Sequence, residues 1–170
     1  LTESSPDIGT ILYTRDSAGD VIGTQDAKGQ ITQIERDVLG RITRIQYAAD
    51  HQVFYAYDAA GRVSRIEDKS GSTTFTRDAQ GRILVKAQTV NDEPANPSRQ
   101  TVQYGYVQGD LTSITYPSGL KVTYQRRAGR IIGLDVQPAG KPAVAFIREL
   151  THTALGQPQD WNWHNGARSS

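Results

Sequence analysis

The stretch 55-YAYDAAGRV-63 is one of four variant copies in the chain, and these copies decide the fold. The others are 13-YTRDSAGDV-21, 34-IERDVLGRI-42 and 75-FTRDAQGRI-83. The glycines of successive copies recur almost evenly, with a period of about 20 residues, and self-similarity at a fixed period is typical of architectures that stack one small unit on the next. The pattern indicates a repeated backbone unit rather than a catalytic centre.

Each unit contains a second turn, because 26-DAKG-29 and 68-DKSG-71 repeat the Asp-x-x-Gly pattern. Successive turn aspartates are therefore only about 10 residues apart, a spacing typical of short strands joined by turns. About six or seven residues remain between turns, an ordinary strand length. In such a turn the aspartate accepts hydrogen bonds from backbone N–H groups and the glycine takes a positive φ. A type I turn closed by a glycine bulge is the favoured hairpin.

The predicted structural turn residues come from the four copies and from two later ones. The later copies, 104-YGYVQGDL-111 and 124-YQRRAGRI-131, are one residue shorter and lack the aspartate, so tighter turns are expected there. The full set is Asp16, Gly19, Asp37, Gly40, Asp58, Gly61, Asp78, Gly81, Gly109 and Gly129.

The segments between turns, such as 41-RITRIQY-47, are rich in β-forming residues. We expect an all-β fold, an antiparallel meander of hairpins. Apolar residues three apart, such as Ile42 and Ile45, suit a helix face better than a strand. Frequent glycine and short intervals still favour strands. Either both faces then carry apolar side chains, or a bulge intervenes.

We expect one repeat segment over residues 1–170, with regular repeats over about 10–86, a loop over 87–103 and degenerate repeats over 104–166. The loop contains Pro94 and Pro97, and the interval from Gly81 to Gly109 is longer than the regular period. This spacing implies an insertion of about seven or eight residues, which a meander tolerates because loop-closure entropy grows slowly with length. The chain begins at Leu1 and contains no methionine, so we expect it to be a piece of a longer polypeptide.

Composition argues against several classes of protein. Nineteen basic and eighteen acidic residues leave a net charge of +1, which favours no nucleic-acid partner. Without cysteine there are no disulfides and no thiolate metal sites. The longest wholly apolar run, 143-AVAFI-147, is too short to span a membrane.

Candidate ligand sites have simpler structural interpretations. Repeated Asp-Gly turns bind calcium in some β-rolls, but each turn here offers one carboxylate, followed in most repeats by arginine. His51, His152 and His164 lack the spacing of a zinc site. Ser118 has no Gly-x-Ser-x-Gly context. We expect no catalytic residue, no metal and no cofactor.

Aromatic residues provide the alternative function. Trp161 and Trp163, together with the tyrosines, are candidates for a sugar-stacking platform on a cell-surface carbohydrate-binding or adhesion module. Aromatic residues on strands are more often cross-strand packing. An enzyme within a β-sandwich is a third possibility, for which the sequence supplies no residues.

These residues resemble the Rhs/YD-repeat family, whose repeat carries Tyr-Asp, two residues, then Gly-Arg and an aliphatic residue. The stretch 55-YAYDAAGRV-63 matches throughout, 116-YPSGLKVTY-124 resembles the family's Tyr-Pro-Ser-Gly segment, and 155-LGQPQDWNWHNG-166 resembles a later segment. Residues from about 10 to 166 are covered. The resemblance implies hairpins that form a curved, spiralling single-layer sheet, as part of a shell or barrel.

The resemblance also implies a function. The chain would be a non-enzymatic structural segment of a secreted or cell-surface bacterial protein, building the wall of a shell that encloses a toxin or effector. Its partners would be the remainder of a larger Rhs-type polypeptide and the enclosed cargo. Self-association through unpaired sheet edges is also expected. The family's self-cleavage segment bears Asp-Pro-x-Gly, and this sequence has no Asp-Pro pair.

Overall fold

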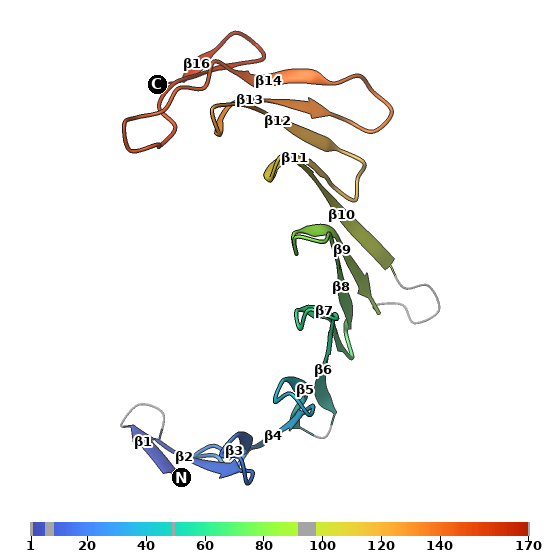
Figure 1. Cartoon of the computed structure of the whole chain (residues 1–170), viewed down its shortest axis with the longest axis vertical. Helices are drawn as coiled ribbons and strands as arrows, with labels where there is room; N and C mark the ends of the chain where they lie inside the picture. Colours follow the sequence, from blue (N-terminus) through green and yellow to red (C-terminus); the bar gives the residue numbers. More distant parts are fainter. Residues whose placement is uncertain (1, 6–8, 49, 92–97, 170) are drawn as a thin grey trace. The chain divides into compact units, whose positions relative to one another are not determined.

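The structure is a computed structural model that describes residues 2–5, 9–48, 50–91 and 98–169. Within these residues the regular secondary structure consists of β-strands alone. Sixteen strands form one sheet in chain order (Figure 1). Paired neighbours run antiparallel, for example β4 with β5 and β12 with β13. The expected all-β hairpin meander is confirmed.

The strand lengths agree with the turn spacing, since β2, β5, β6 and β8 contain seven residues each. The strands are β1 (Thr2–Ser5), β2 (Gly9–Arg15), β3 (Val21–Gln25), β4 (Ile31–Arg36), β5 (Ile42–Ala48), β6 (His51–Tyr57), β7 (Val63–Asp68), β8 (Gly71–Arg77), β9 (Ile83–Val90), β10 (Ser98–Val107), β11 (Asp110–Thr115), β12 (Lys121–Arg127), β13 (Arg130–Gln137), β14 (Val144–Arg148), β15 (Trp161–Trp163) and β16 (Arg168–Ser169).

The chain divides into two compact units. The first comprises Leu1–Phe75 and Gln88–Arg99, and the second comprises Thr76–Ala87 and Gln100–Ser170. Strands β1–β7 belong to the first unit and β11–β16 to the second, while β8, β9 and β10 contribute residues to both. That the whole chain is a single repeat segment stays a prediction.

A β-bulge follows the turn of five hairpins at the same place. In the hairpin of β4 and β5, Glu35 pairs with Arg44 but Arg36 pairs with Ile42, so Thr43 is an extra residue. The equivalent extra residue always lies three positions after the turn glycine. These residues are Ile22, Thr43, Ser64, Thr112 and Ile132.

The bulge explains why apolar residues recur three apart. Ile42 pairs with Arg36, and Ile45 pairs with Ile34. Arg36 and Ile34 are two residues apart on one strand, so their side chains lie on one face. Ile42 and Ile45 therefore lie on that same face, because a bulge places two residues opposite one. Of the two alternatives open from the sequence, the bulge is the one found.

In four hairpins, a residue at or next to the end of the first strand reaches the preceding hairpin. The phenolic O–H of Tyr57 donates to the carbonyl of Ile42 at 2.6 Å. The corresponding donors and carbonyls are Arg36 with Val21 at 3.3 Å, Tyr106 with Ile83 at 3.1 Å, and Arg126 with Leu111 at 3.2 Å. We name Arg36, Tyr57, Tyr106 and Arg126 the docking residues.

The later turns are tighter, as expected from their shorter motifs. Val107 pairs directly with Asp110, which leaves a two-residue loop. Its residues Gln108 and Gly109 have φ angles of 51° and 95°. Two positive φ angles are what a type I′ hairpin loop requires. The loop at Ala128 and Gly129 is built in the same way, with φ angles of 49° and 78°.

The expected bounds of the long loop were wrong. Strand β9 continues to Val90 and β10 begins at Ser98, so residues 87–90 and 98–103 are strand. Pro94 and Pro97 lie outside the described residues. Polar residues can form strands here because main-chain hydrogen bonds hold the strands together. One example is the bond from Asn91 N–H to the Ser70 carbonyl at 2.8 Å.

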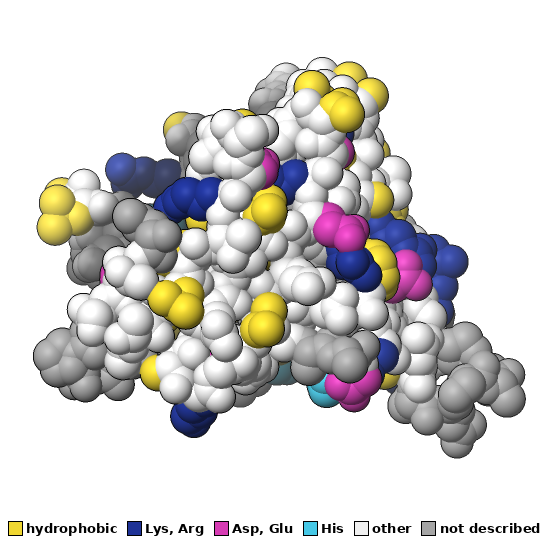
Figure 2. All heavy atoms as spheres, turned by 90° about the horizontal axis from the view of Figure 1, so that it is seen from below, with side chains coloured by type: hydrophobic (Ala, Val, Ile, Leu, Met, Phe, Trp, Pro, Cys, Tyr) yellow, Lys and Arg dark blue, Asp and Glu magenta, His cyan; other side chains and the backbone are white. Residues whose placement is uncertain are grey.

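The sheet has almost no conventional core. Among the described residues Ala87, 4% exposed, is the one buried hydrophobic side chain, and no polar or charged side chain is buried. Large apolar side chains such as Leu12, Ile31 and Phe54 are about half exposed. On the face drawn in Figure 2, hydrophobic side chains form separate patches among charged side chains, other side chains and backbone. Cross-strand pairs such as Ile34 with Ile45 therefore carry much of the apolar packing.

The docking bond gives a first prediction. Tyr57→Phe removes the O–H that bonds the Ile42 carbonyl and keeps the ring, so it should lower the free energy of unfolding by about 1 kcal/mol. Urea denaturation followed by circular dichroism measures this loss. Tyr55→Phe, on the same face of β6, is the control and should change the free energy much less. Equal losses in the two variants would contradict the role of the bond.

Candidate functional site

The turn carboxylates are the most regular polar feature of the chain. In the turn 58-DAAG-61, Oδ1 of Asp58 accepts from the N–H groups of Ala60 at 3.0 Å and Arg62 at 2.9 Å. Its other oxygen accepts from Nε of Arg62 at 2.9 Å. The glycine N–H donates to the Asp58 carbonyl at 2.9 Å, and Gly61 has a φ of 78°. Each carboxylate therefore caps its own turn.

The other aspartates predicted to form turns lie in the same geometry. Asp37 and Asp78 each accept from two backbone N–H groups and pair with the arginine that follows the glycine. Asp16 makes the two backbone bonds. The glycines of these turns have positive φ angles, namely Gly19, Gly40 and Gly81.

These contacts use the carboxylate oxygens that a cation would need. Oδ2 of Asp37 lies 2.6 Å from the Arg41 guanidinium, and Oδ2 of Asp78 lies 2.7 Å from that of Arg82. Within the described residues, no three His, Asp or Glu side chains are placed to hold a metal ion.

The pKa values of three turn aspartates lie below the ordinary value. The pKa of Asp37 is lowered mainly by the hydrogen bond from the Arg41 side chain. The pKa of Asp58 is lowered mainly by the backbone N–H of Arg62. For Asp78, burial raises the pKa, but the hydrogen bonds from Arg82 lower it by more, so that the pKa lies below its ordinary value. The turns therefore stabilise the ionised carboxylates.

Other polar residues singled out from the sequence do not converge. Nδ1 of His51 lies 2.8 Å from a carboxylate oxygen of Asp50, whose other oxygen lies 3.1 Å from Lys69 Nζ. Hydrogen bonds from the side chains of His51 and Lys69 lower the pKa of Asp50 to about 2. His152 forms an isolated bridge with Pro158, and Ser118 Oγ accepts from its own turn.

The two tryptophans lie in an aromatic cluster. The rings of Trp161 and Trp163 meet edge to face at 6.0 Å, and Trp163 meets Phe146 edge to face at 5.6 Å. Phe146 also stacks on His164 at 5.4 Å. The three larger rings are half-buried. The two tryptophans contact each other along β15, and Trp163 packs across strands on Phe146 of β14. A carbohydrate site at Trp161 and Trp163 stays a prediction.

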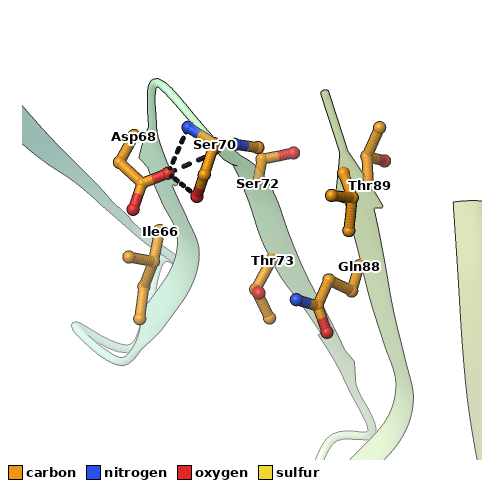
Figure 3. A pocket seen from close by; sticks show the side chains of 9 residues that line it. Ile66, Asp68, Ser70, Ser72, Thr73, Gln88 and Thr89 are labelled. Atoms are coloured by element: carbon orange, nitrogen blue, oxygen red, sulfur yellow. Dashed lines mark hydrogen bonds between the residues drawn. The ribbon is translucent and has the colours of Figure 1, made fainter. Parts of the chain in front are cut away.

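A shallow depression lies beside β7, β8 and β9 (Figure 3). Oδ1 of Asp68 accepts from Ser70 N–H at 2.8 Å, Ser70 Oγ at 2.5 Å and Gly71 N–H at 3.2 Å, so it caps its turn. This turn differs from the other Asp-x-x-Gly turns, because Asp68 pairs directly with Gly71. A Cβ added at Gly71 would lie 2.0 Å from the Thr89 carbonyl oxygen. Gly71 therefore allows close contact between β8 and β9.

The docking residues are functional positions that the sequence reasoning missed. Each immediately precedes the turn aspartate or the residue in its place, and Tyr57 is the tyrosine of a Tyr-Asp pair. The signal was therefore present in the motif, but the sequence favoured only sugar stacking or cross-strand packing for its tyrosines. What the position does depends on contact with the preceding hairpin, which spacing does not reveal.

Comparison with known proteins agrees with the repeat architecture. A family described as RHS Repeat matches residues 57–93. The chain is 26% identical over 146 residues to the "Double-stranded DNA deaminase toxin A" of Burkholderia cenocepacia, covering 85% of this chain and 8% of that protein. It is 26% identical over 177 residues to the "Probable deoxyribonuclease RhsB" of Dickeya dadantii, covering 96% of this chain and 12% of that protein.

The chain therefore contains an RHS repeat at residues 57–93 and resembles Rhs proteins over most of its length. Solved structures share its fold: a TcdB2–TccC3 complex without the hypervariable C-terminal region matches 99% of the chain with a TM-score of 0.82 and 17% identity. The Tc holotoxin pore of Photorhabdus luminescens matches 97% with a TM-score of 0.78 and 19% identity. The chain spans 10% and 9% of the respective matched chains. These matches show that the chain shares the fold of the matched segments.

The turn carboxylates predict an acid-dependent loss of stability. A carboxyl whose pKa is lower in the folded chain stabilises the fold above the unfolded pKa of about 3.9, and this contribution is lost as the pH falls through the folded pKa. Urea denaturation between about pH 5 and pH 2 should show this loss. The variant Asp37→Asn, Asp58→Asn, Asp78→Asn should be less stable at pH 7 and less dependent on pH. An unchanged pH dependence in this variant would contradict the stabilising role of the three turn carboxylates.

Gly71 predicts a localised steric effect. In Gly71→Ala the new methyl group would meet the Thr89 carbonyl, and the φ of 151° disfavours any side chain. We expect a loss of at least about 2 kcal/mol in the free energy of unfolding. Gly19→Ala is the matched control, because Gly19 has a φ of 91° but no heavy atom within 4 Å of the added carbon. Its loss should be smaller, about 1 kcal/mol. Thermal and urea denaturation compare the two.

Proposed function

We propose that this chain is a non-enzymatic wall segment of a secreted bacterial Rhs/YD-repeat polypeptide, in which it helps to enclose a toxin or effector domain. The observation that carries this proposal is the sheet itself, which has one buried hydrophobic side chain among its described residues. A single layer must cover its apolar side chains with further layers, further repeats or a cargo. A wall around an enclosed domain meets that need.

The side chains of the repeat are engaged in building the sheet. The turn aspartates cap their own turns, and the docking residues bond the preceding hairpin. Repeat proteins in general are stabilised by such nearest-neighbour contacts. The recurring polar residues are therefore proposed to be structural, with no cation at the Asp-x-x-Gly turns.

The relatives support a role inside a larger polypeptide. The chain matches 8% and 12% of two proteins whose names include a toxin and a deoxyribonuclease. We assign the chemical activities in those names to parts of those proteins other than the matched repeats. For this chain, the proposed partners are the rest of its own polypeptide, joined through the edges of the sheet, and the enclosed domain. No helix in the described residues is long and apolar enough to cross a bilayer.

Limited proteolysis of the complete polypeptide tests enclosure. The domain inside the wall should resist trypsin, and Gly71→Ala should expose it to cleavage, because the substitution disrupts contact between β8 and β9. Gly19→Ala, at an open turn, should leave the protection largely intact. Wild-type protein whose other domains are all digested as fast as they are in isolation would overturn the proposal.

A further inference from the structure

A second residue position also contributes to the contact between successive hairpins. It is the residue directly after the turn glycine, which we name the leading residue. We call the contact between two successive hairpins a junction. In four junctions the leading residue lies one residue before the residue whose carbonyl group the docking residue bonds. The leading residues of these junctions are Asp20, Arg41, Arg82 and Asp110.

A leading arginine is followed by a docking tyrosine. The guanidinium carbon of Arg41 lies 4.4 Å from the ring centroid of Tyr57, and that of Arg82 lies 4.7 Å from the ring centroid of Tyr106. Both distances suit attraction between a cation and an aromatic face. Arg41 and Arg82 are fixed in place by their own turn aspartates, so each presents a preformed cation to the next hairpin.

A leading aspartate is followed by a docking arginine. Arg36 donates from one guanidinium nitrogen to the Gly40 carbonyl at 2.9 Å and from the other to the Val21 carbonyl at 3.3 Å. A Cβ added at Gly40 would lie 3.8 Å from a carboxylate oxygen of Asp20, so this carboxylate lies beside the turn that Arg36 holds. Asp110 is followed in the same way by Arg126, which bonds Leu111 and Gly129.

We propose that the leading and docking residues form a rule for neighbour selection between hairpins. A hairpin with a leading arginine selects a following hairpin with a docking tyrosine, and a leading aspartate selects a docking arginine. The physical basis is that a tyrosine face attracts a cation, whereas a docking arginine beside a leading arginine places two positive charges together. The rule concerns the order and register of hairpins and is independent of whether the sheet encloses a cargo.

The chain departs from the rule at two places. In sequence, the leading Arg62 is followed by Arg77. Arg148, which follows Arg130, instead forms an ion pair with Asp135 and bonds the Leu134 carbonyl. This ion pair supplies a carboxylate to Arg148 from β13, in place of a leading aspartate.

Four substitutions test the rule in matched and mismatched combinations. They are Arg41→Asp, Arg82→Asp, Tyr57→Arg and Tyr106→Arg. The matched double variants R41D/Y57R and R82D/Y106R convert one type of junction into the other. The mismatched double variants R41D/Y106R and R82D/Y57R contain the same types of substitution at hairpins that are not neighbours. All four doubles thus have the same composition and net charge.

Thermal denaturation of the 170-residue chain compares these variants. We expect the mean melting temperature of the matched doubles to exceed that of the mismatched doubles by at least about 3 °C, the shift that follows from a coupling of about 1 kcal/mol. If a mismatched variant does not fold, strand signal in the far-ultraviolet circular dichroism of the matched variants alone supports the rule equally. Matched and mismatched doubles with equal melting temperatures, or equal loss of strand signal, would overturn it.

Discussion

The structure depends on one recurring hydrogen bond, from the docking residue of one hairpin to a carbonyl of the hairpin before it. Each carbonyl belongs to the residue two positions after a turn glycine, as Ile42 follows Gly40. In the hairpins of Ile42 and Leu111, the next residue is a bulge. A bulge interrupts the regular ladder of main-chain hydrogen bonds, and a carbonyl that loses its ladder partner needs another donor. The docking side chain supplies that donor, so an irregularity within one hairpin becomes the attachment point for the next.

The same bulge determines which residues the sheet can shield. Strict alternation would place Ile42 and Ile45 on opposite faces, but the extra residue returns them to one face with Ile34. In each repeat, apolar side chains then pack mainly against those of neighbouring strands. Almost every side chain keeps some solvent exposure. Stability in such a sheet accumulates from contacts between adjacent hairpins, as in other repeat architectures, rather than from a central core.

The sequence predicted those features that depend on local chemistry. The regular recurrence of Asp-x-x-Gly predicted strands and turns, because an aspartate such as Asp58 caps its own turn with its own carboxylate. Features that depend on a partner strand were not predicted. The position of the bulge and the role of Tyr57 require the register with a neighbour, which composition does not contain. The loop over 87–103 was drawn too long for the same reason, since main-chain pairing can keep polar residues in strands.

The insertion between β9 and β10 shows that docking is specified by the residues in contact rather than by their spacing. The docking residues Arg36, Tyr57 and Arg126 each bond a carbonyl 15 residues earlier. Tyr106 bonds the equivalent carbonyl of Ile83, 23 residues earlier, and receives the cation of Arg82 over its ring. Eight additional residues therefore leave the junction unchanged. Because the cost of closing a longer loop rises slowly, one hydrogen bond and one cation–aromatic contact suffice to restore the register after an insertion.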